Sequence, residues 1–429
     1  MAGRLAKIFK GDLTLWVILI FLSLISLVIV YSATGKLAYR EAHGNTMYYL
    51  IRQVIFILVG FGIMLFVVNV IPVTLYFKVS PALIGVTVFT LILAFIQYKI
   101  TGGDKETSRS LTLPFFSFQP AELAKISLVM FAARLLSKAQ RTEEELKNAF
   151  FWITGTAGAI CFLIFLSNFS TAALIFFTII VLMLIARVAF KYVASLVGIG
   201  AVLVVLIYFT ADIFPDSFGR IHTVKSRIET FVNGTGKKEV SGTKQEEYAR
   251  LAIFEGGVVG KGPGNSEVSN YMEAGYNDFI YAIYIEEYGF LGGAFLVLLY
   301  LILLYRGVII VRRCDRTFPA FTVAGLVLLM TFQAFINMAV SVGAVPVTGQ
   351  PLPWVSMGGS SMLFTAASFG VILAVSADNQ KRKFEEEQLA KAALEPQTEA
   401  TSETPADSET NTDKEVATEP ESPTDDQKF

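Results

Sequence analysis

Long apolar runs separated by short polar segments dominate the chain up to residue 378. A bilayer-spanning helix needs about 20 predominantly apolar residues, and ten runs come close to that length. The fourth run is the weakest, because it carries Glu122, Lys125 and Arg134. The pattern predicts an all-α polytopic membrane protein with ten transmembrane helices, at residues 13–33, 49–71, 79–98, 120–137, 149–166, 170–187, 191–209, 278–305, 317–341 and 359–378.

Lysine and arginine residues concentrate in alternate connecting segments, and this bias sets the orientation of membrane proteins. The short segments on the depleted side hold few basic residues, namely Arg40, Lys99, Lys105 and Arg109. We therefore expect a cytoplasmic N-terminus over residues 1–12, a ten-helix domain over residues 13–378, a cytoplasmic C-terminus, and a long extracytoplasmic loop over residues 210–277.

Two segments lie outside the predicted helices. The long loop is polar and without a steady apolar period, and it is either an exposed binding surface or a tether; both interpretations stay open. After residue 378 the sequence becomes rich in Glu, Thr, Ser and Pro, which cannot bury enough apolar surface to offset the entropy of ordering. Residues 379–429 are therefore predicted to form a disordered acidic cytoplasmic tail.

Composition agrees with a membrane protein and excludes several other classes. The chain of 429 residues is 54% hydrophobic and 17% charged, with a mean hydropathy of +0.57. The net charge of −1 gives no reason to expect nucleic-acid binding. With two cysteines and two histidines far apart in the sequence, neither a disulfide framework nor a histidine-based metal site is indicated.

The stretch from Glu255 to Gly293 contains the most unusual residues, and Asp278 opens its apolar run. Aspartate suits the N-cap of a helix, which is the structural interpretation. A helix over residues 278–305 would be about 42 Å long against a hydrocarbon core of about 30 Å. Its first turns, and Asp278 with them, would stand at the outer interface. Both interpretations of Asp278 stay open.

Two glutamates follow Asp278 in the same run. At 100° per residue Glu287 points away from Asp278 and Glu286 lies about 80° round, so they form no obvious catalytic carboxylate pair with it. We expect them to support the site. Upstream, Gly260–Ser266 is glycine-rich but lacks the spacing of a nucleotide-binding loop. It is either a simple turn or a backbone that approaches a substrate, with Lys261 facing phosphate.

Two further segments carry unusual residues. Pro120 fits the first position of the fourth helix, and Glu122 and Lys125 are spaced for a salt bridge. Ionisable groups in a spanning helix are also functional candidates, and both interpretations stay open. Between Val345 and Ser361, three prolines and several glycines forbid regular helix. Such backbone at membrane depth must be sheltered by protein or line a cavity, which predicts a re-entrant outer loop.

The order of these motifs resembles the SEDS family (shape, elongation, division and sporulation). The resemblance covers essentially residues 12–378. The sequences of the motifs are more similar to those of the division enzymes of the family than to those of the elongation enzymes. The motifs are VYSATG, SFQPAELAK, STA, GKGPGNS, NDFIYAIYIEEYG, QAFIN and VPVTGQPLPWVSMGGSS.

The resemblance implies a peptidoglycan glycosyltransferase that polymerises lipid II at the outer face of the cytoplasmic membrane during cell division. Asp278 falls on the family's essential acidic position, and is expected to be the general base. Arg109, Lys125 and Lys261 are expected to bind the pyrophosphate. The supporting residues are expected to be Gln119, Glu122, Gly262, Gly264, Ser266, Glu286, Glu287 and Ser360. One departure from the family pattern is Asn277, where a threonine or serine is usual.

The same resemblance implies partners and leaves other functions open. The expected partners are lipid II, a class B penicillin-binding protein that acts as transpeptidase, and other membrane proteins of the division machinery. No tightly bound cofactor is expected beyond a divalent cation, Mg or Mn, which would assist the pyrophosphate. The alternatives are a lipid II transporter and a non-enzymatic division scaffold.

Overall fold

The computed structural model describes residues 9–41, 43–100, 110–112, 117–210, 225–227, 229, 241–272 and 275–399. The chain divides into two units, Met1–Gln380 and Lys381–Phe429. The elements in chain order are α2 (Leu13–Ala33), α3 (Gly35–Glu41), α4 (Thr46–Val70), α5 (Val73–Ile100), β1 (Leu111–Thr112), β2 (Ser117–Phe118), α6 (Pro120–Lys138), α7 (Glu143–Phe165), α8 (Phe169–Ile185), α9 (Phe190–Thr210), α11 (Ser241–Gly256), the 3-10 turn η3 (Val268–Asn270), α12 (Gly275–Asp278), α13 (Ile280–Arg312), α14 (Thr317–Ser341) and α15 (Ser360–Glu399).

Each of the ten predicted spans coincides with a helix. Within the described residues, eight helices are long and apolar enough to cross a membrane. The other two are α8, which is apolar but has 17 residues, and α6, the span whose charges made it the weakest. The fold is that of a polytopic, multi-pass α-helical membrane protein, as predicted.

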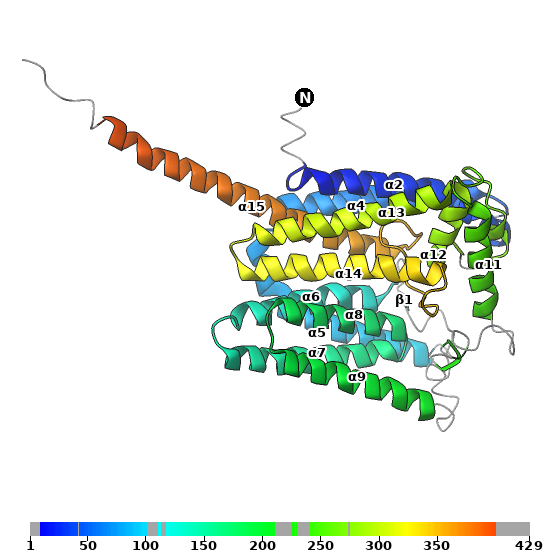
Figure 1. The fold of residues 1–429 in the computed structure, drawn as a ribbon, viewed down its shortest axis with the longest axis horizontal. Coiled ribbons are helices and arrows are strands. Elements are labelled where there is room, and N and C mark those ends of the chain that lie inside the picture. Colours follow the sequence, from blue (N-terminus) through cyan, green and yellow to red (C-terminus); the bar gives the residue numbers. More distant parts are fainter. Residues whose placement is uncertain are drawn as a thin grey trace, which may run out of the picture. The chain divides into compact units, whose positions relative to one another are not determined.

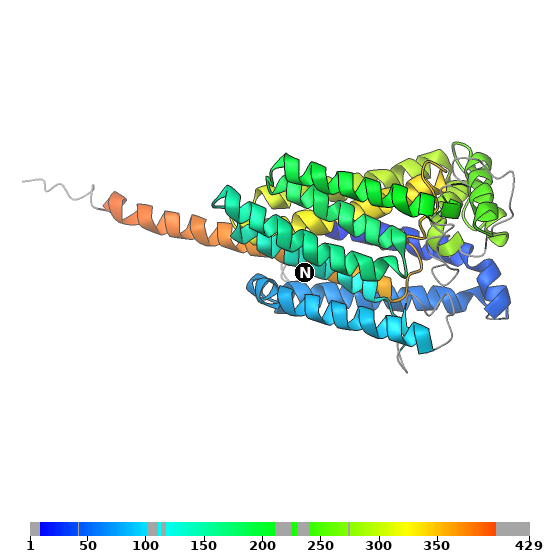
Figure 2. The same cartoon turned by 90° about the horizontal axis from the view of Figure 1, so that it is seen from below.

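The buried centre of the helical unit is α14 with α6 beside it. Helix α14 packs against α13, α6 and α8, and 72% of its most apolar window is buried. In Figure 1 it lies between α13 and α6, and Figure 2 shows the helices running side by side. Lipid-facing helices show the opposite pattern, because only 11% of the corresponding window of α9 is buried. Glu122 and Lys125 of α6 are therefore enclosed by protein.

Local sequence signals start several helices. The Asp12 carboxylate accepts a hydrogen bond from the backbone N–H of Thr14 at 2.9 Å and so caps α2. The same carboxylate accepts a hydrogen bond from Arg306 Nε at 2.9 Å, which ties the start of α2 to α13. Pro120 occupies the first turn of α6, as predicted. Before α6, β1 and β2 form a two-stranded antiparallel pair.

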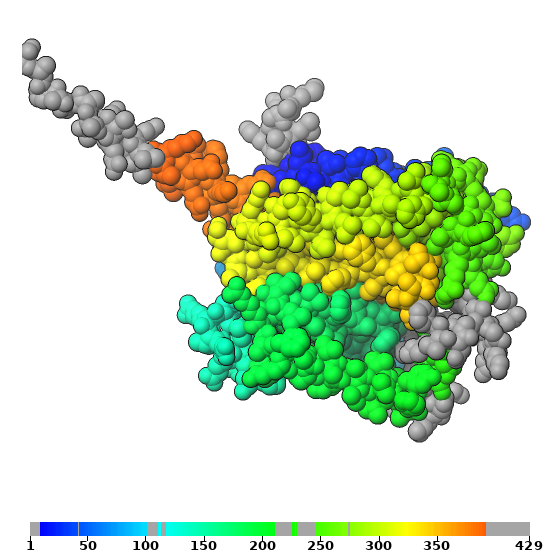
Figure 3. Space-filling view, in the orientation of Figure 1, coloured from blue at the N-terminus to red at the C-terminus, as the bar shows by residue number. Residues whose placement is uncertain are grey.

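Residues 241–272 and 275–278 are folded onto the helices and do not form a simple tether. Helix α11 packs against α13, and its residues Ala249 and Ala252 are fully buried. Figure 3 shows α11 lying across the ends of α13 and α14. The buried positions of α11 include Glu246, Ala249 and Ala252, so the helix packs without a strong apolar period.

The C-terminal prediction also needs correction. Helix α15 continues to Glu399, so residues 379–399 are helical rather than disordered. Glutamate, lysine, alanine and leucine are strong helix formers, and Lys381 pairs with Glu385 one turn on at 3.6 Å. The rest of the predicted tail, residues 400–429, lies outside the described residues.

Helix α13 begins differently from the prediction. Asp278 ends the short helix α12, and the N-cap position of α13 is Phe279, which makes no side-chain cap. Asp278 is therefore not the N-cap of the long helix. The helix also breaks at Gly289, which has φ 67° and ψ −172°. The straight helix assumed from residue 278 is thus wrong. The part after the break still has about 35 Å of length, enough to cross the hydrocarbon core alone.

Candidate functional site

Two predicted site residues are joined through one face of α14. Lys125 Nζ donates to Gln333 Oε1 at 2.8 Å, and Asn337 Nδ2 donates to the Asp278 carbonyl oxygen at 3.0 Å. Gln333 and Asn337 are four residues apart and therefore neighbours on the helix surface, with Cβ atoms about 6 Å apart. The Lys125 side chain and the Asp278 backbone are thus held by neighbouring positions on α14.

Lys125 and Glu122 form a buried ion pair, the structural interpretation of their spacing. The Lys125 Nζ and Glu122 Oε1 atoms are 2.8 Å apart, and the two side chains are 4% and 9% exposed. A lone charge at this depth would be costly, so each group stabilises the other. The ammonium has three donors, and its contacts to Glu122 and Gln333 use two of them.

The segment between α14 and α15 is a re-entrant loop sheltered by protein, as the prolines and glycines predict. On the α14 side, Gln333 donates to the Pro351 carbonyl and Asn337 to the Gln350 carbonyl, each at 2.8 Å. Gln350 itself donates to Thr171 Oγ1 of α8 at 2.8 Å. Side-chain amides thus satisfy a backbone that has no helical partners.

The other side of this loop is held by α2 and α13. Trp354 donates from its indole nitrogen to Ser23 Oγ at 2.8 Å, and Ser26 donates to the Val355 carbonyl at 2.7 Å. Tyr300 of α13 donates to the Pro353 carbonyl at 2.5 Å. Trp354 is 2% exposed, and its buried side chain fixes the loop between these helices.

The backbone around Asp278 is fixed on both sides of the residue. Ser356 of the re-entrant loop donates to the Asn277 carbonyl at 2.8 Å, and Asn337 binds the next carbonyl. The Asp278 side chain is half-buried. A carboxylate on a rigid, partly open backbone is suited to accept a proton from a bound molecule.

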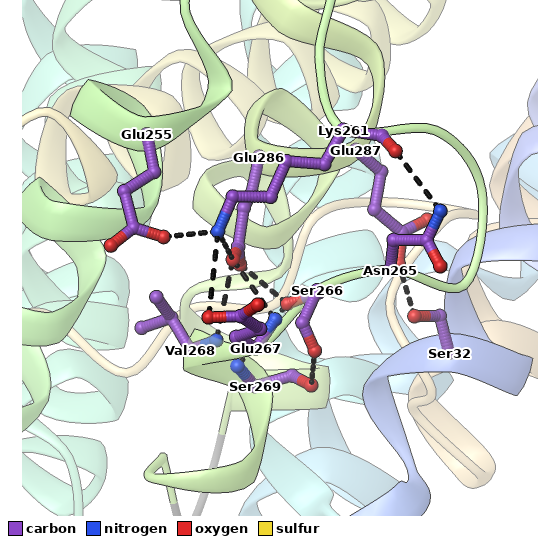
Figure 4. A network of polar contacts seen from close by, with 10 residues as sticks. All are labelled: Ser32, Glu255, Lys261, Asn265, Ser266, Glu267, Val268, Ser269, Glu286 and Glu287. Carbon is purple, nitrogen blue, oxygen red and sulfur yellow. Dashed lines mark hydrogen bonds and ion pairs between the residues drawn. The ribbon is translucent and has the colours of Figure 1, made fainter.

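Glu286 organises the glycine-rich loop from a fully buried position (Figure 4). Its carboxylate accepts a hydrogen bond from the Ser266 hydroxyl at 2.5 Å. It also accepts bonds from the backbone N–H groups of Glu267 at 3.0 Å and Val268 at 3.3 Å. In the other direction, the Gly262 N–H donates to the Glu287 carbonyl at 2.9 Å. The glycine-rich loop is therefore built onto the first turns of α13.

Lys261 is engaged by carboxylates in this second cluster. It forms an ion pair with Glu255, and its Nζ lies 3.3 Å from Glu286 Oε1. The hydrogen bond to Glu255, followed by the one to Glu286, raises the pKa of the Lys261 ammonium above its usual 10.5. Lys261 is thus a firmly charged residue whose described contacts are structural, and none of them joins it to Lys125.

Glu287 connects the same turns to α2. Its carboxylate accepts a hydrogen bond from the Ser32 hydroxyl, near the end of α2 (Figure 4). The Glu287 side chain is 1% exposed. Glu286 and Glu287 therefore contact different neighbours, and their supporting role stays a prediction.

The other predicted site residues make few described contacts with Asp278 or Lys125. Gln119 is exposed at the N-cap position of α6 and makes no capping hydrogen bond there, while Ser360 is the first residue of α15. Gly262 and Gly264 have φ of 92° and 78°, a conformation that favours glycine. Arg109 lies outside the described residues. Within the part of the chain that the structure describes, no three potential metal ligands of the His, Cys, Asp and Glu types gather. The expected divalent cation stays a prediction.

Gln333 and Asn337 were missed as site residues by the sequence reasoning. They stand in the motif QAFIN, inside an apolar run, where an amide must find a partner. Their spacing of four residues was a usable signal, because it places two amides on one helix face.

Comparison with known proteins places the chain among cell-wall proteins. Residues 12–381 match the family of FtsW, RodA and SpoVE, described as "Cell cycle protein". The probable peptidoglycan glycosyltransferase FtsW of Geobacter sulfurreducens is 30% identical over 371 residues, covering 86% of this chain and 96% of that protein. Stage V sporulation protein E of Bacillus subtilis is 30% identical over 370 residues, covering 85% and 96%.

Solved structures share the fold. One, from work on the coordination of polymerization and crosslinking by a peptidoglycan synthase complex, aligns with a TM-score of 0.64 at 22% identity, covering 86% of this chain and 98% of that one. The rod shape determining protein RodA of Thermus thermophilus aligns with a TM-score of 0.59 at 20% identity, covering 86% and 97%. With a family match over residues 12–381 and relatives 30% identical over most of its length, the chain belongs to the FtsW/RodA/SpoVE family, the SEDS proteins.

Proposed function

We propose that the chain is a peptidoglycan glycosyltransferase that polymerises lipid II into β-1,4 glycan strands during cell division. Relatives that align over 96% of their own length carry the name peptidoglycan glycosyltransferase FtsW. The family also includes a sporulation protein and RodA. The proposed division role therefore rests on the relatives' names and on the amino-acid sequences of the motifs.

The observation that carries the proposal is the connection of Asp278 to Lys125 through Gln333 and Asn337. A glycosyl transfer needs a base for the incoming hydroxyl and positive charge for the leaving pyrophosphate. The Asp278 backbone and the Lys125 ammonium are held by two amides one helical turn apart on α14, and together the two residues supply both types of group.

Asp278 acts as the general base. It accepts the proton of the 4-hydroxyl of an N-acetylglucosamine, whose oxygen attacks the anomeric carbon of the N-acetylmuramic acid of a second lipid II. The bond from that carbon to undecaprenyl pyrophosphate breaks as the new one forms, with inversion. A well-placed base contributes about 10²–10⁴-fold in rate. No general acid is needed, because pyrophosphate leaves as an anion.

Lys125 stabilises the charge that develops on the pyrophosphate. Its third N–H remains for a phosphate oxygen beside Glu122 and Gln333. Glu122 and Gln333 then hold the ammonium in one orientation before substrate arrives, which is where electrostatic preorganisation acts. Arg109 and Lys261 are the further cations of the proposal, with Glu286 and Glu287 positioning the glycine-rich loop.

The proposed setting is the outer face of the cytoplasmic (inner) membrane at the division septum, with both termini in the cytoplasm. The bias of lysine and arginine supports this orientation. The proposed partners are a class B penicillin-binding protein and other division proteins, and a divalent cation, Mg or Mn, that binds with the substrate phosphates.

The test is polymerisation of labelled lipid II by the chain reconstituted with its transpeptidase partner. Asp278→Asn keeps the shape of the side chain but cannot accept the proton, so we expect glycan polymer to fall at least about a hundredfold. Glu144→Gln, an exposed change in α7 at the other end of the helices, is the matched control. Normal polymer from folded, partner-bound Asp278→Asn contradicts the base assignment.

A second measurement separates enzyme from transporter. In a leaflet-exposure assay the same proteoliposomes report movement of labelled lipid II without polymer formation. The transporter would be favoured by two results together: the Asp278→Asn variant still moves lipid II, and the unaltered chain forms no polymer.

A further inference from the structure

A cavity of about 550 Å³ opens at the end of the helices opposite Asp278. It lies between the start of α5, the end of α6 and the start of α14. Since α13 runs from the Asp278 end to Arg312, the connection to α14 that borders this cavity is a full helix length away. The lining residues are Val73, Thr74, Phe77, Lys78, Ser137, Lys138, Asp315, Arg316, Thr317, Phe318 and Pro319.

The charged residues of the cavity are mostly positive. Lys78 and Lys138 are exposed, and neither forms an ion pair within the described part of the chain. Arg316 is already paired with Asp378, and Asp315 is the one carboxylate of the lining. With Arg316 matched by Asp378, two lysines stand against the single carboxylate of Asp315, so the cavity keeps one net positive charge for an anion.

The cavity also has an aromatic floor. The Phe77 and Phe318 rings meet edge to face, with centroids 5.1 Å apart. Lys138 Nζ stands 5.5 Å from the Phe77 centroid, and the Arg134 guanidinium lies 4.6 Å from it and donates to the Phe77 carbonyl at 2.7 Å. These contacts hold the Lys138 charge above an apolar surface. Cations above an apolar floor are complementary to a group that is anionic at one end and apolar at the other.

We propose that this cavity binds the phosphate headgroup of an anionic phospholipid from the adjacent leaflet. Helices α5 and α14 are membrane spans, so their first turns mark the level at which headgroups lie. Leu75, beside the cavity, is 41% exposed and continues the lipid-facing side of α5. Basic pockets between transmembrane helices at this level recognise phospholipid headgroups. Lys78 and Lys138 bind the phosphate beside the first turn of α14.

The test measures lipid binding to the delipidated full-length chain by native mass spectrometry. The probes are cardiolipin, phosphatidylglycerol and the uncharged phosphatidylcholine. We expect Lys78→Gln with Lys138→Gln to weaken binding of the anionic lipids about 30-fold, because each lysine near a charged headgroup contributes about fivefold. Lys147→Gln with Lys191→Gln removes the same charge from the same end of the helices and should change binding less than about twofold.

Three results would overturn the proposal. Equal losses in the two double variants would mean unspecific attraction, and equal binding of phosphatidylcholine would mean that charge is not recognised. Glycerol phosphate binding as tightly as phosphatidylglycerol would replace the lipid with a soluble phosphate ligand. Thermal unfolding without lipid shows whether each variant is folded, and Lys78→Arg with Lys138→Arg should retain binding.

Discussion

Asn337 donates one side-chain amide to both the Asp278 carbonyl, at 3.0 Å, and the Gln350 carbonyl, at 2.8 Å. One group therefore ties the chain just before α13 to the re-entrant loop. Asn337 is 1% exposed, so water does not readily replace either bond. The position of the Asp278 backbone thus depends on a residue that the proposed chemistry never uses.

Asn337→Ala should disturb catalysis through this positioning. Loss of the buried donor leaves two carbonyls unpaired and costs about 1–3 kcal/mol in the free energy of unfolding. We expect polymer formation to fall at least about tenfold. Asn337→Asp should be worse, because a carboxylate offers no donor to two carbonyl oxygens. Lipid II polymerisation and thermal unfolding, with exposed Asn69→Ala as the control, check this expectation; equal activity of the two alanine variants contradicts it.

The pair of Lys125 and Glu122 allows stability and activity to be separated. Either Lys125→Met or Glu122→Leu alone leaves an unmatched buried charge and should cost about 3–5 kcal/mol. The double variant should recover most of that stability, because two apolar side chains replace both charges. It should still form no polymer, since the cation for pyrophosphate is gone. A thermal unfolding series with the four proteins measures the coupling, and polymer from the double variant would remove Lys125 from the mechanism.

Lys261 predicts a pH dependence of stability at alkaline pH only. Its pKa is raised on folding by Glu255 first and then Glu286, so the folded protein binds this proton more tightly than the unfolded chain. The contribution is complete below the usual pKa of 10.5 and is lost as the pH rises through the raised value. Melting temperatures from about pH 8 to about pH 12 should show Lys261→Gln losing its deficit at the alkaline end. Melting curves of Lys261→Gln and the unaltered chain that stay parallel up to about pH 12 would contradict this role of Lys261.

The sequence was sufficient for the spans because each depends on local apolar length. Helix α11 was not predicted from the sequence. Its buried residues include Ala249, Ala252 and Glu246, which carry no strong hydrophobic signal. The continuation of α15 beyond residue 378 was not predicted either. The tail as a whole is rich in Glu, Thr, Ser and Pro, but its first twenty or so residues hold strong helix formers.

The site was harder to predict, since its geometry depends on distant segments. Asp278 looked like an N-cap, yet Ser356, far along the chain, fixes the preceding carbonyl and ends α12 there. Lys261 also contacts Glu286 of α13, which lies 25 residues further along the chain. The pairing of Lys125 with Glu122 was readable because the two residues share one turn. Contacts within a turn follow from spacing, and contacts between segments do not.

Gly289 gives the last prediction, because its backbone joins α13 to the glycine-rich loop. With φ 67° and ψ −172° it occupies a region open essentially to glycine alone, which costs other residues about 1–3 kcal/mol. A Cβ atom here would also collide with the backbone of Val258. The next two residues, Phe290 and Leu291, donate their N–H groups to Gly257 and Val258 at 2.9 and 3.2 Å.

Gly289→Ala should therefore push the turn after α11 away from α13 and loosen the contacts of Glu286. We expect a lower melting temperature and a loss of polymer formation with lipid II binding partly retained, because the support of the loop fails before the membrane helices do. Gly158→Ala is the matched control: it lies within α7, and a Cβ there meets no heavy atom within 4 Å. Alanine in a helix costs less than glycine, so this variant should be at least as stable as the unaltered chain. If both variants behave alike, the break at Gly289 has no part in holding the site.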